Sequence, residues 1–229
     1  MKLTFVSGTG TDVGKTYVAA TFAKSLAGRG HRIGVYKPVA SGCIGQSNNF
    51  VDRVSIDADL LTRALDGGCT ESSIDPLLVC PQRFLSPTAP DAAARTEGSQ
   101  VDPRLLYEGA LRWQPRCDHL IVEGAGGLFS PIADELLNID LYRQFLANGS
   151  LDCQLVLVAP NRLGVLHDTI ATYRAAIACG VSVDRLFLNT TDENPDPSVA
   201  TNAIQLRKWL PELHLIEVDW QATAESFDF

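Results

Sequence analysis

Short apolar runs, each bounded by Gly, Pro, Asn or Ser, recur along the chain and alternate with stretches of helical spacing. The runs that predict strands are residues 3–6, 32–36, 120–122, 155–158, 186–188 and 213–218. Helical spacing begins near Gly14 and stops at residues 28–30, with Val18, Phe22 and Leu26 on one face, and it recurs over residues 57–61 and 170–178. Strands that alternate with helices predict βαβ units. We therefore expect an α/β fold with a mostly parallel sheet and helices on both faces.

Residues 81–103 break this alternation. They are rich in Pro, Ala and Ser, a composition that predicts a long surface loop. No internal repeat or linker marks a domain boundary elsewhere, so we expect a single domain over residues 1–229.

A glycine-rich loop joins the first predicted strand to the first predicted helix. It reads GTGTDVGKT over residues 8–16. Glycines let consecutive backbone N–H groups surround an anion, and the helix N-terminus adds partial positive charge. Lys15 can then reach the terminal phosphates of a nucleotide, and the Thr16 hydroxyl can bind Mg²⁺. This context predicts a P-loop NTPase-like fold, although five residues rather than four separate Gly8 from Gly14.

Two acidic positions could complete such a site. Glu123 ends the apolar run at 120–122 and precedes three glycines among the next four residues, so it is expected at the carboxyl edge of the sheet, where ligands of open α/β folds bind. Asp57 and Asp59 lie in the first turn of a predicted helix. Acidic residues there commonly interact with the helix dipole, and periodicity alone does not separate that role from metal binding.

A second lysine, Lys37, follows the second predicted strand and precedes Pro38, Val39, Ser41 and Gly42. It is expected at the same edge of the sheet as the phosphate loop. Two lysines at one site suggest that one neutralises the triphosphate and the other stabilises a transferring phosphoryl group or an anionic acceptor.

Composition limits the remaining possibilities. The net charge of −8 argues against a nucleic-acid partner, which calls for basic surfaces. No apolar run approaches the ~20 residues of a membrane span, and residues 3–6 are too short for a signal-peptide core, so we expect a cytoplasmic protein without a membrane partner.

The six cysteines contain no C-x-x-C pair, and we expect free, mostly buried thiols.

Taken together, these motifs resemble the dethiobiotin synthetase family. The lengthened phosphate loop, the lysine motif at residues 37–42, and residues 122–127 followed by Pro131 are each similar to that family's motifs, and the similarity runs from residue 5 to about residue 189. The resemblance implies a homodimeric, magnesium- and ATP-dependent ligase of biotin biosynthesis. Such an enzyme joins 7,8-diaminononanoate to CO₂ or bicarbonate as a carbamate, phosphorylates the carbamate to a mixed carbamic–phosphoric anhydride, and closes the cyclic urea.

The resemblance also implies roles for individual residues. Thr16, Asp57 and Glu123 would bind Mg²⁺, which favours the metal role of Asp57 over the helix-turn role. Lys15, Lys37 and Thr11 would be catalytic. The nucleotide-binding residues would be Asp12, Val13, Gly14, Lys15, Thr16, Tyr17, Asp57, Glu123, Gly124, Ala125, Gly126 and Asn189. The substrate-binding residues would be Lys37 and Ser41, with Gly164, Val165, Leu166 and His167 contributed by the partner subunit.

Three positions depart from the family pattern. Asp12 stands where many members carry Glu, and His167-Asp168 replaces an Asn-His pair. Residues 216–220 lack the proline that usually follows the last strand and frames the base.

Other P-loop functions fit the sequence less well. Partitioning and septum-positioning ATPases share the fold, but they carry a lysine near the loop start, where this chain has Gly10, and they lack the motif at Lys37. Cobyrinate-type ligases usually append a glutaminase domain, for which 229 residues leave no room. A catalytically inactive descendant would not need to retain Lys15, Thr16, Lys37 and Glu123.

Overall fold

The computed structural model describes residues 1–46, 49–65 and 74–224. The strands are β1 Lys2–Gly8, β2 Ile33–Tyr36, β3 His119–Gly127, β4 Pro131–Ala133, β5 Leu136–Leu137, β6 Asp152–Pro160, β7 Arg185–Asn189 and β8 His214–Val218. The helices are α1 Lys15–Gly28, the 3₁₀ turn η1 Phe50–Asp52, α2 Ile56–Arg63, α3 Pro76–Val79, α4 Pro90–Thr96, α5 Pro103–Leu111, α6 Asn138–Leu146, α7 Val165–Ala178 and α8 Val199–Trp209.

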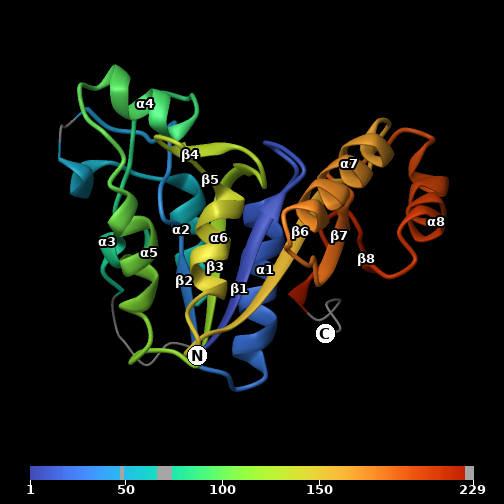
Figure 1. The fold of residues 1–229 in the computed structure, drawn as a ribbon, viewed down its shortest axis with the longest axis horizontal. Helices are drawn as coiled ribbons and strands as arrows, with labels where there is room; N and C mark the ends of the chain where they lie inside the picture. The colour runs from blue at the N-terminus through green and yellow to red at the C-terminus, as the bar shows by residue number, and fades with distance from the viewer. Residues whose placement is uncertain (47–48, 66–73, 225–229) are drawn as a thin grey trace.

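Six strands form one sheet in the order β2-β3-β1-β6-β7-β8, and every neighbouring pair is parallel. Each of these strands coincides with an apolar run from which the sequence predicts a strand. The prediction of a mostly parallel P-loop NTPase-like sheet is therefore confirmed. The short strands β4 and β5 form a separate antiparallel hairpin above α6 (Figure 1).

Helices cover both faces of the sheet, and the side-chain alternation of the strands shows how. Phe5 lies 5.6 Å, between ring centroids, from Tyr142 of α6. The preceding residue, Thr4, points to the opposite face, where its hydroxyl is 2.8 Å from His119 Nε2, and the His119 ring packs edge-on against Phe22 of α1. In Figure 1, α6 accordingly lies in front of the sheet and α1 behind it. All of these side chains are buried.

The prediction of a long surface loop over residues 81–103 is wrong. The segment contains α4, which begins at Pro90, and Phe84 and Ala93 are completely buried. Proline fixes φ at a helical value and needs no amide partner at the first helical position, so here it starts a helix rather than ending one. At seven residues, α4 is too short to show a clear helical periodicity in the sequence.

Cysteine burial follows the prediction only in part. Among the described cysteines, which form no disulfide, Cys43, Cys80 and Cys117 are buried, Cys153 is half-buried and Cys179 is exposed. Cys69 lies outside the described residues. Within the described ranges, none of the helices combines the length and apolar content needed to cross a membrane.

Candidate functional site

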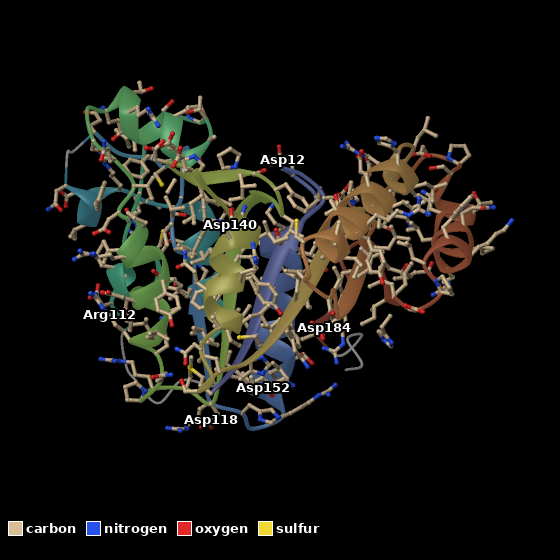
Figure 2. The ribbon with its side chains drawn as sticks, in the orientation of Figure 1. Asp12, Arg112, Asp118, Asp140, Asp152 and Asp184 are labelled. Atoms are coloured by element: carbon tan, nitrogen blue, oxygen red, sulfur yellow. The ribbon has the colours of Figure 1, made fainter. Side chains whose placement is uncertain are left out.

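A cleft of about 950 Å³ lies along the carboxyl edge of the sheet. The loop after β1 enters it from the centre, the ends of β2 and β3 from one side, and the segments after β7 and β8 from the other. Figure 2 shows Asp12 at this end of β1, pointing away from the sheet, whereas Asp118 and Asp152 lie at the opposite end. Open α/β sheets bind ligands at this edge, because the loops there can diverge.

The phosphate loop is packed too tightly for side chains at two of its glycines. A Cβ at Gly8 would lie 2.7 Å from Val13 Cγ2, and a Cβ at Gly14 would lie 2.0 Å from Asn189 Nδ2. Gly14 also caps α1 with a φ of +90°, a conformation that glycine adopts without strain.

Hydrogen bonds from Thr9 N to Val158 O (3.0 Å) and from Leu128 N to Gly8 O (2.8 Å) fix the loop to the flanking strands. The loop is therefore preorganised.

Lys15 folds back over this loop. Its ammonium donates to Gly10 O at 2.8 Å, and its side chain lines the cleft. Burial, and after it the charge of Lys37, lowers the pKa of Lys15, although Glu123 opposes the shift. The ammonium is therefore incompletely compensated, which favours the arrival of an anion.

Beside the phosphate loop, Lys37 contacts two carboxylates from two other elements. Its ammonium lies 2.7 Å from Glu123 Oε1 and 2.9 Å from Asp57 Oδ2. The Thr16 hydroxyl donates to the same Glu123 oxygen at 2.8 Å. Burial works against the charge on Lys37, but Glu123 and Asp57 together hold its pKa above the ordinary value. The same contact with Lys37 lowers the pKa of Asp57 despite its desolvation.

The sequence does not decide whether Asp57 and Asp59 cap a helix or bind a metal. The structure shows that the two residues differ in position. Ser55 caps α2, accepting from Ala58 N at 3.2 Å. Asp57 turns toward Lys37, whereas Asp59 is exposed and does not line the cleft. Only Asp57 therefore joins the cluster.

Buried charged side chains that no sequence pattern predicts support the loop that carries Lys37. Ala40 pairs with residues 82–84 through two backbone hydrogen bonds, from Ala40 N to Gln82 O and from Phe84 N to Ala40 O. Arg83 Nη1 donates to Arg53 O at 2.7 Å, and Arg53 Nη1 pairs with Glu97 at 2.6 Å. Both arginines are buried, so this network fixes the position of residues 37–42 relative to α4.

The glycines after Glu123 serve close packing. A Cβ at Gly124 would lie 2.5 Å from the Asn138 side-chain oxygen. Asn138 is fully buried and donates to Ala125 O (2.7 Å) and Gly127 O (2.8 Å). Asn138 therefore holds the end of β3 in the conformation that brings Ala125 and Gly126 to the cleft.

At the β7–β8 side, Asn189 meets the phosphate loop. Its side-chain nitrogen donates to Val13 O at 3.1 Å, while its oxygen is buried without a hydrogen-bond partner in the described part of the chain. Trp220 and Gln221, directly after β8, line the same cleft. Tyr17 donates through its hydroxyl to Ala222 O and so connects this segment to α1.

Most of the residues that the sequence singles out line this cleft: Thr11, Asp12, Gly14, Lys15, Thr16, Tyr17, Lys37, Ser41, Asp57, Glu123, Ala125, Gly126 and Asn189. Val13 and Gly124 are buried beneath it. Residues 164–167 are not part of it. They form the start of α7, and His167 lines a second, smaller hollow together with Trp209. The segment 87–90 and residues Trp220 and Gln221 line the cleft without having been predicted.

Comparisons of structure place the fold among known P-loop proteins. A ParA family ATPase from Chlorobium tepidum aligns with a TM-score of 0.54 at 14% identity, covering 97% of this chain and 86% of the other. The signal recognition particle receptor FtsY from Elizabethkingia anophelis aligns with a TM-score of 0.56 at 11% identity, covering 100% of this chain and 61% of the other. At such identities the likeness concerns the fold alone.

Comparisons of sequence are more specific. The profile of an AAA domain family matches residues 2–225. The ATP-dependent dethiobiotin synthetase BioD of Rhodopirellula baltica is 44% identical over 211 residues, covering 90% of this chain and 80% of the relative. Its namesake in Anaeromyxobacter dehalogenans (strain 2CP-C) is 31% identical over 222 residues, covering 96% and 91%. The sequence similarity, extending over nearly the whole chain, shows that the protein belongs to the ATP-dependent dethiobiotin synthetase family.

Proposed function

We propose that this protein is an ATP-dependent dethiobiotin synthetase that closes the ureido ring on 7,8-diaminononanoate and CO₂ or bicarbonate. The observation that carries the proposal is the position of Lys37, a second lysine beside the phosphate loop, in contact with Glu123 and Asp57. A nucleotide hydrolase needs the phosphate loop and an acidic partner. An enzyme that transfers phosphate to an anionic acceptor also needs a cation on the acceptor side.

In the proposed reaction one amine of the substrate first adds to CO₂, forming a C–N bond and losing a proton to give a carbamate. Two further chemical steps follow. An oxygen of the substrate carbamate attacks the γ-phosphorus of ATP, forming a P–O bond and expelling ADP. The second amine then attacks the carbamoyl carbon and forms a C–N bond. The bond between this carbon and the phosphate oxygen breaks, phosphate leaves with its electron pair, and the attacking amine loses a proton. Phosphorylation is required because a free carbamate is a poor electrophile, whereas phosphate is a good leaving group.

The donors in the cleft suit Mg²⁺. Thr16, Asp57 and Glu123 offer one hydroxyl and two carboxylates, the hard oxygen donors that Mg²⁺ takes in small number. Glu123 Oε2 is buried and has no hydrogen-bond partner among the described residues, so it retains an open acceptor. We assign the ion to these three residues. When bound, it supplies charge neutralisation across the transferring phosphates.

The chain's own groups account for the rest of the step. Backbone N–H groups of residues 12–17, Lys15 and Thr11 hold the phosphates, and Gly124, Ala125 and Gly126 allow the substrate to approach the end of β3 closely. Lys37 stabilises negative charge on the carbamate and the transferring phosphoryl group, and Ser41 contacts the acceptor. The buried oxygen of Asn189, which has no hydrogen-bond partner among the described residues, suits the exocyclic amine of adenine.

The far end of the substrate requires a second subunit in this proposal. Residues 164–167 begin α7 outside the cleft of their own subunit. In a homodimer, the N-terminus of the partner's α7 would hold the substrate carboxylate, as the resemblance implies. We place the reaction in the cytoplasm, without nucleic acid or a membrane as partner.

The deciding experiment measures ADP release from MgATP and bicarbonate with and without 7,8-diaminononanoate, and identifies the product by mass spectrometry. Release that requires the diamine, together with dethiobiotin, is the expected result. Lys37→Ala should abolish turnover and retain ATP binding, while Lys24→Ala, at an exposed position on α1, should behave as wild type. ADP release that ignores the diamine would instead indicate an ATPase of the partitioning type.

A further inference from the structure

The end of the cleft beside Lys37, where the proposed reaction places its acceptor, is lined by two segments outside the six-stranded sheet. Residues 40–42 follow Lys37, and residues 87–90 lead into α4, which lies beyond the carboxyl end of the sheet in Figure 1. A Cβ at Gly42 would lie 3.5 Å from Pro87 Cβ, so the two segments are in close contact. We call residues 40–42 and 87–90 the acceptor walls.

Backbone hydrogen bonds join the two walls, but only up to residue 86. Gly42 N donates to Ser86 O at 3.0 Å and Cys43 N to Phe84 O at 2.9 Å, in addition to the two bonds of Ala40. The second wall begins directly after Ser86. Its position therefore depends on how the chain is held on both sides of it, by this pairing before it and by α4 after it.

Glu97 at the end of α4 supplies the hold on the far side. One oxygen of its carboxylate accepts from Leu85 N at 2.6 Å, just before the second wall. The other oxygen lies 2.6 Å from Arg53 Nη1. The carboxylate thus ties the end of α4 to the residue that precedes the wall, and closes the intervening segment into a loop of fixed span.

Arg53 transmits this contact to the first wall. Its guanidinium also donates to Arg83 O, and Arg83 Nη1 donates back to Arg53 O at 2.7 Å. Arg83 lies beside Ala40, with which it forms a parallel bridge. The side chains of Arg53 and Glu97 are 3% and 18% exposed, so solvent screens their ion pair much less than a surface pair. One carboxylate is therefore connected to both walls.

We propose that Glu97 is a positioning residue for the acceptor. It does not line the cleft, but its contacts with Leu85 and Arg53 hold the acceptor walls together and so set the width of the cleft at that end. The inference rests on the proposed function, because it takes this end as the place where 7,8-diaminononanoate binds.

The nucleotide should not depend on Glu97. Hydrogen bonds involving Val158 and Leu128 fix the phosphate loop, and both residues belong to other parts of the fold than the acceptor walls. Loss of the Glu97 carboxylate should therefore loosen the acceptor walls and leave the phosphate loop in place. A small displacement of a group that orients a substrate is sufficient to reduce binding and turnover strongly.

The test measures two dissociation constants by calorimetry: that of MgATP, and that of 7,8-diaminononanoate with bicarbonate and the magnesium complex of β,γ-methylene-ATP. Glu97→Ala should weaken binding of the diamine about tenfold or more and change that of MgATP less than about twofold. Glu97→Gln keeps an oxygen for Leu85 N but loses the charge, so it should recover part of the affinity. The matched control is Arg95→Ala on α4, which removes exposed ion pairs with Asp91 and Asp134 and should bind both ligands as wild type.

A merely structural role would lower the melting temperature without this selective loss. Unchanged affinity for the diamine in Glu97→Ala, equal losses for both ligands, or the same loss in Arg95→Ala would overturn the inference. If Glu97→Ala does not fold, Arg53→Lys supplies the test. It keeps a cation near Glu97 but cannot reach Glu97 and Arg83 O with separate nitrogens, and it should show the same selective loss. A wild type that binds MgATP but not the diamine would overturn the proposed function itself.

Discussion

Replacing Lys37 by Met tests whether the cluster around it is held together as a buried ion pair. Methionine preserves the length and the apolar stem but removes the ammonium. The side chain of Lys37 is 4% exposed and that of Glu123 1%, so the substitution leaves a carboxylate in the interior without its cation. Asp57 is 46% exposed at its side chain and is screened by water, so it contributes little to the cost.

The magnitude follows from the cost of an unpaired buried charge. Removing one partner of a buried pair costs about 3–5 kcal/mol, and the Thr16 hydroxyl, which still donates to Glu123, favours the lower end. At about 3 kcal/mol, and about 2–4 °C per kcal/mol for a protein of this size, the melting temperature should fall by roughly 6–12 °C.

The loss of stability should depend on pH, because the unpaired carboxylate of Glu123 is costly only while it is charged. Without Lys37, a proton on the buried carboxyl of Glu123 removes the cost of its unpaired charge, so the folded variant binds this proton more tightly than the unfolded chain does. The stability of the variant then falls as pH rises. Thermal melts at pH 8 and pH 5 should show the larger deficit at pH 8.

Two controls make the result decisive. Adding Glu123→Gln to Lys37→Met removes the unpaired charge and should restore most of the lost stability, and Lys24→Met should melt as wild type. A deficit that is equal at both pH values, or one that Glu123→Gln does not reduce, would refute the ion-pair reasoning.

Three further predictions concern other residues. Gly14→Ala should weaken MgATP binding at least tenfold in calorimetry, because its Cβ would lie 2.0 Å from Asn189 Nδ2 at a φ of +90°; unchanged affinity would show that the loop adapts. Asp57→Asn should raise the Mg²⁺ concentration needed for half-maximal activity, and an unchanged titration would return Asp57 to a helix-turn role. Burial lowers the pKa of His119 to about 4, so as the pH falls the unfolded chain binds a proton at this residue before the folded state does. The free energy of unfolding should therefore decline as the pH falls from 6.5 towards 4. His119→Gln should flatten that decline in urea titrations by up to about 3 kcal/mol, and an identical pH dependence in the variant would contradict this.

Patterns in short stretches of the sequence were sufficient to predict the elements that depend only on neighbouring residues. The inner strands of the sheet are apolar on both faces and bounded by breakers, and the half-exposed edge strand β8 still contains an apolar run, so each of the six was predicted. The phosphate loop is one continuous segment whose glycines, lysine and threonine are all visible in order. The carboxyl-edge position of Glu123 followed from the end of a strand.

The features that escaped prediction depend on distant segments. Nothing near Arg53 or Arg83 reveals that the two arginines meet beneath the loop of Lys37, because 30 residues separate them along the chain. The composition of residues 81–103 resembles a loop because a short alanine-rich helix starting at proline has too few apolar positions to show periodicity. The cleft-lining position of Trp220 arises only once β8 has paired with β7.

The contact between Tyr17 and Ala222 bears on the order in which the protein acquires activity. The phosphate loop takes its own residues from β1 and the start of α1, and its supporting hydrogen bonds come from Leu128 and Val158. The cleft around it is completed only by residues as far along the chain as 221. Closing a contact over such a separation is slow, because the loop-closure entropy must be overcome before the contact stabilises anything. During synthesis, a nascent chain could therefore form a phosphate-binding loop long before it could hold a complete nucleotide. Base binding would then report the completion of folding rather than its onset.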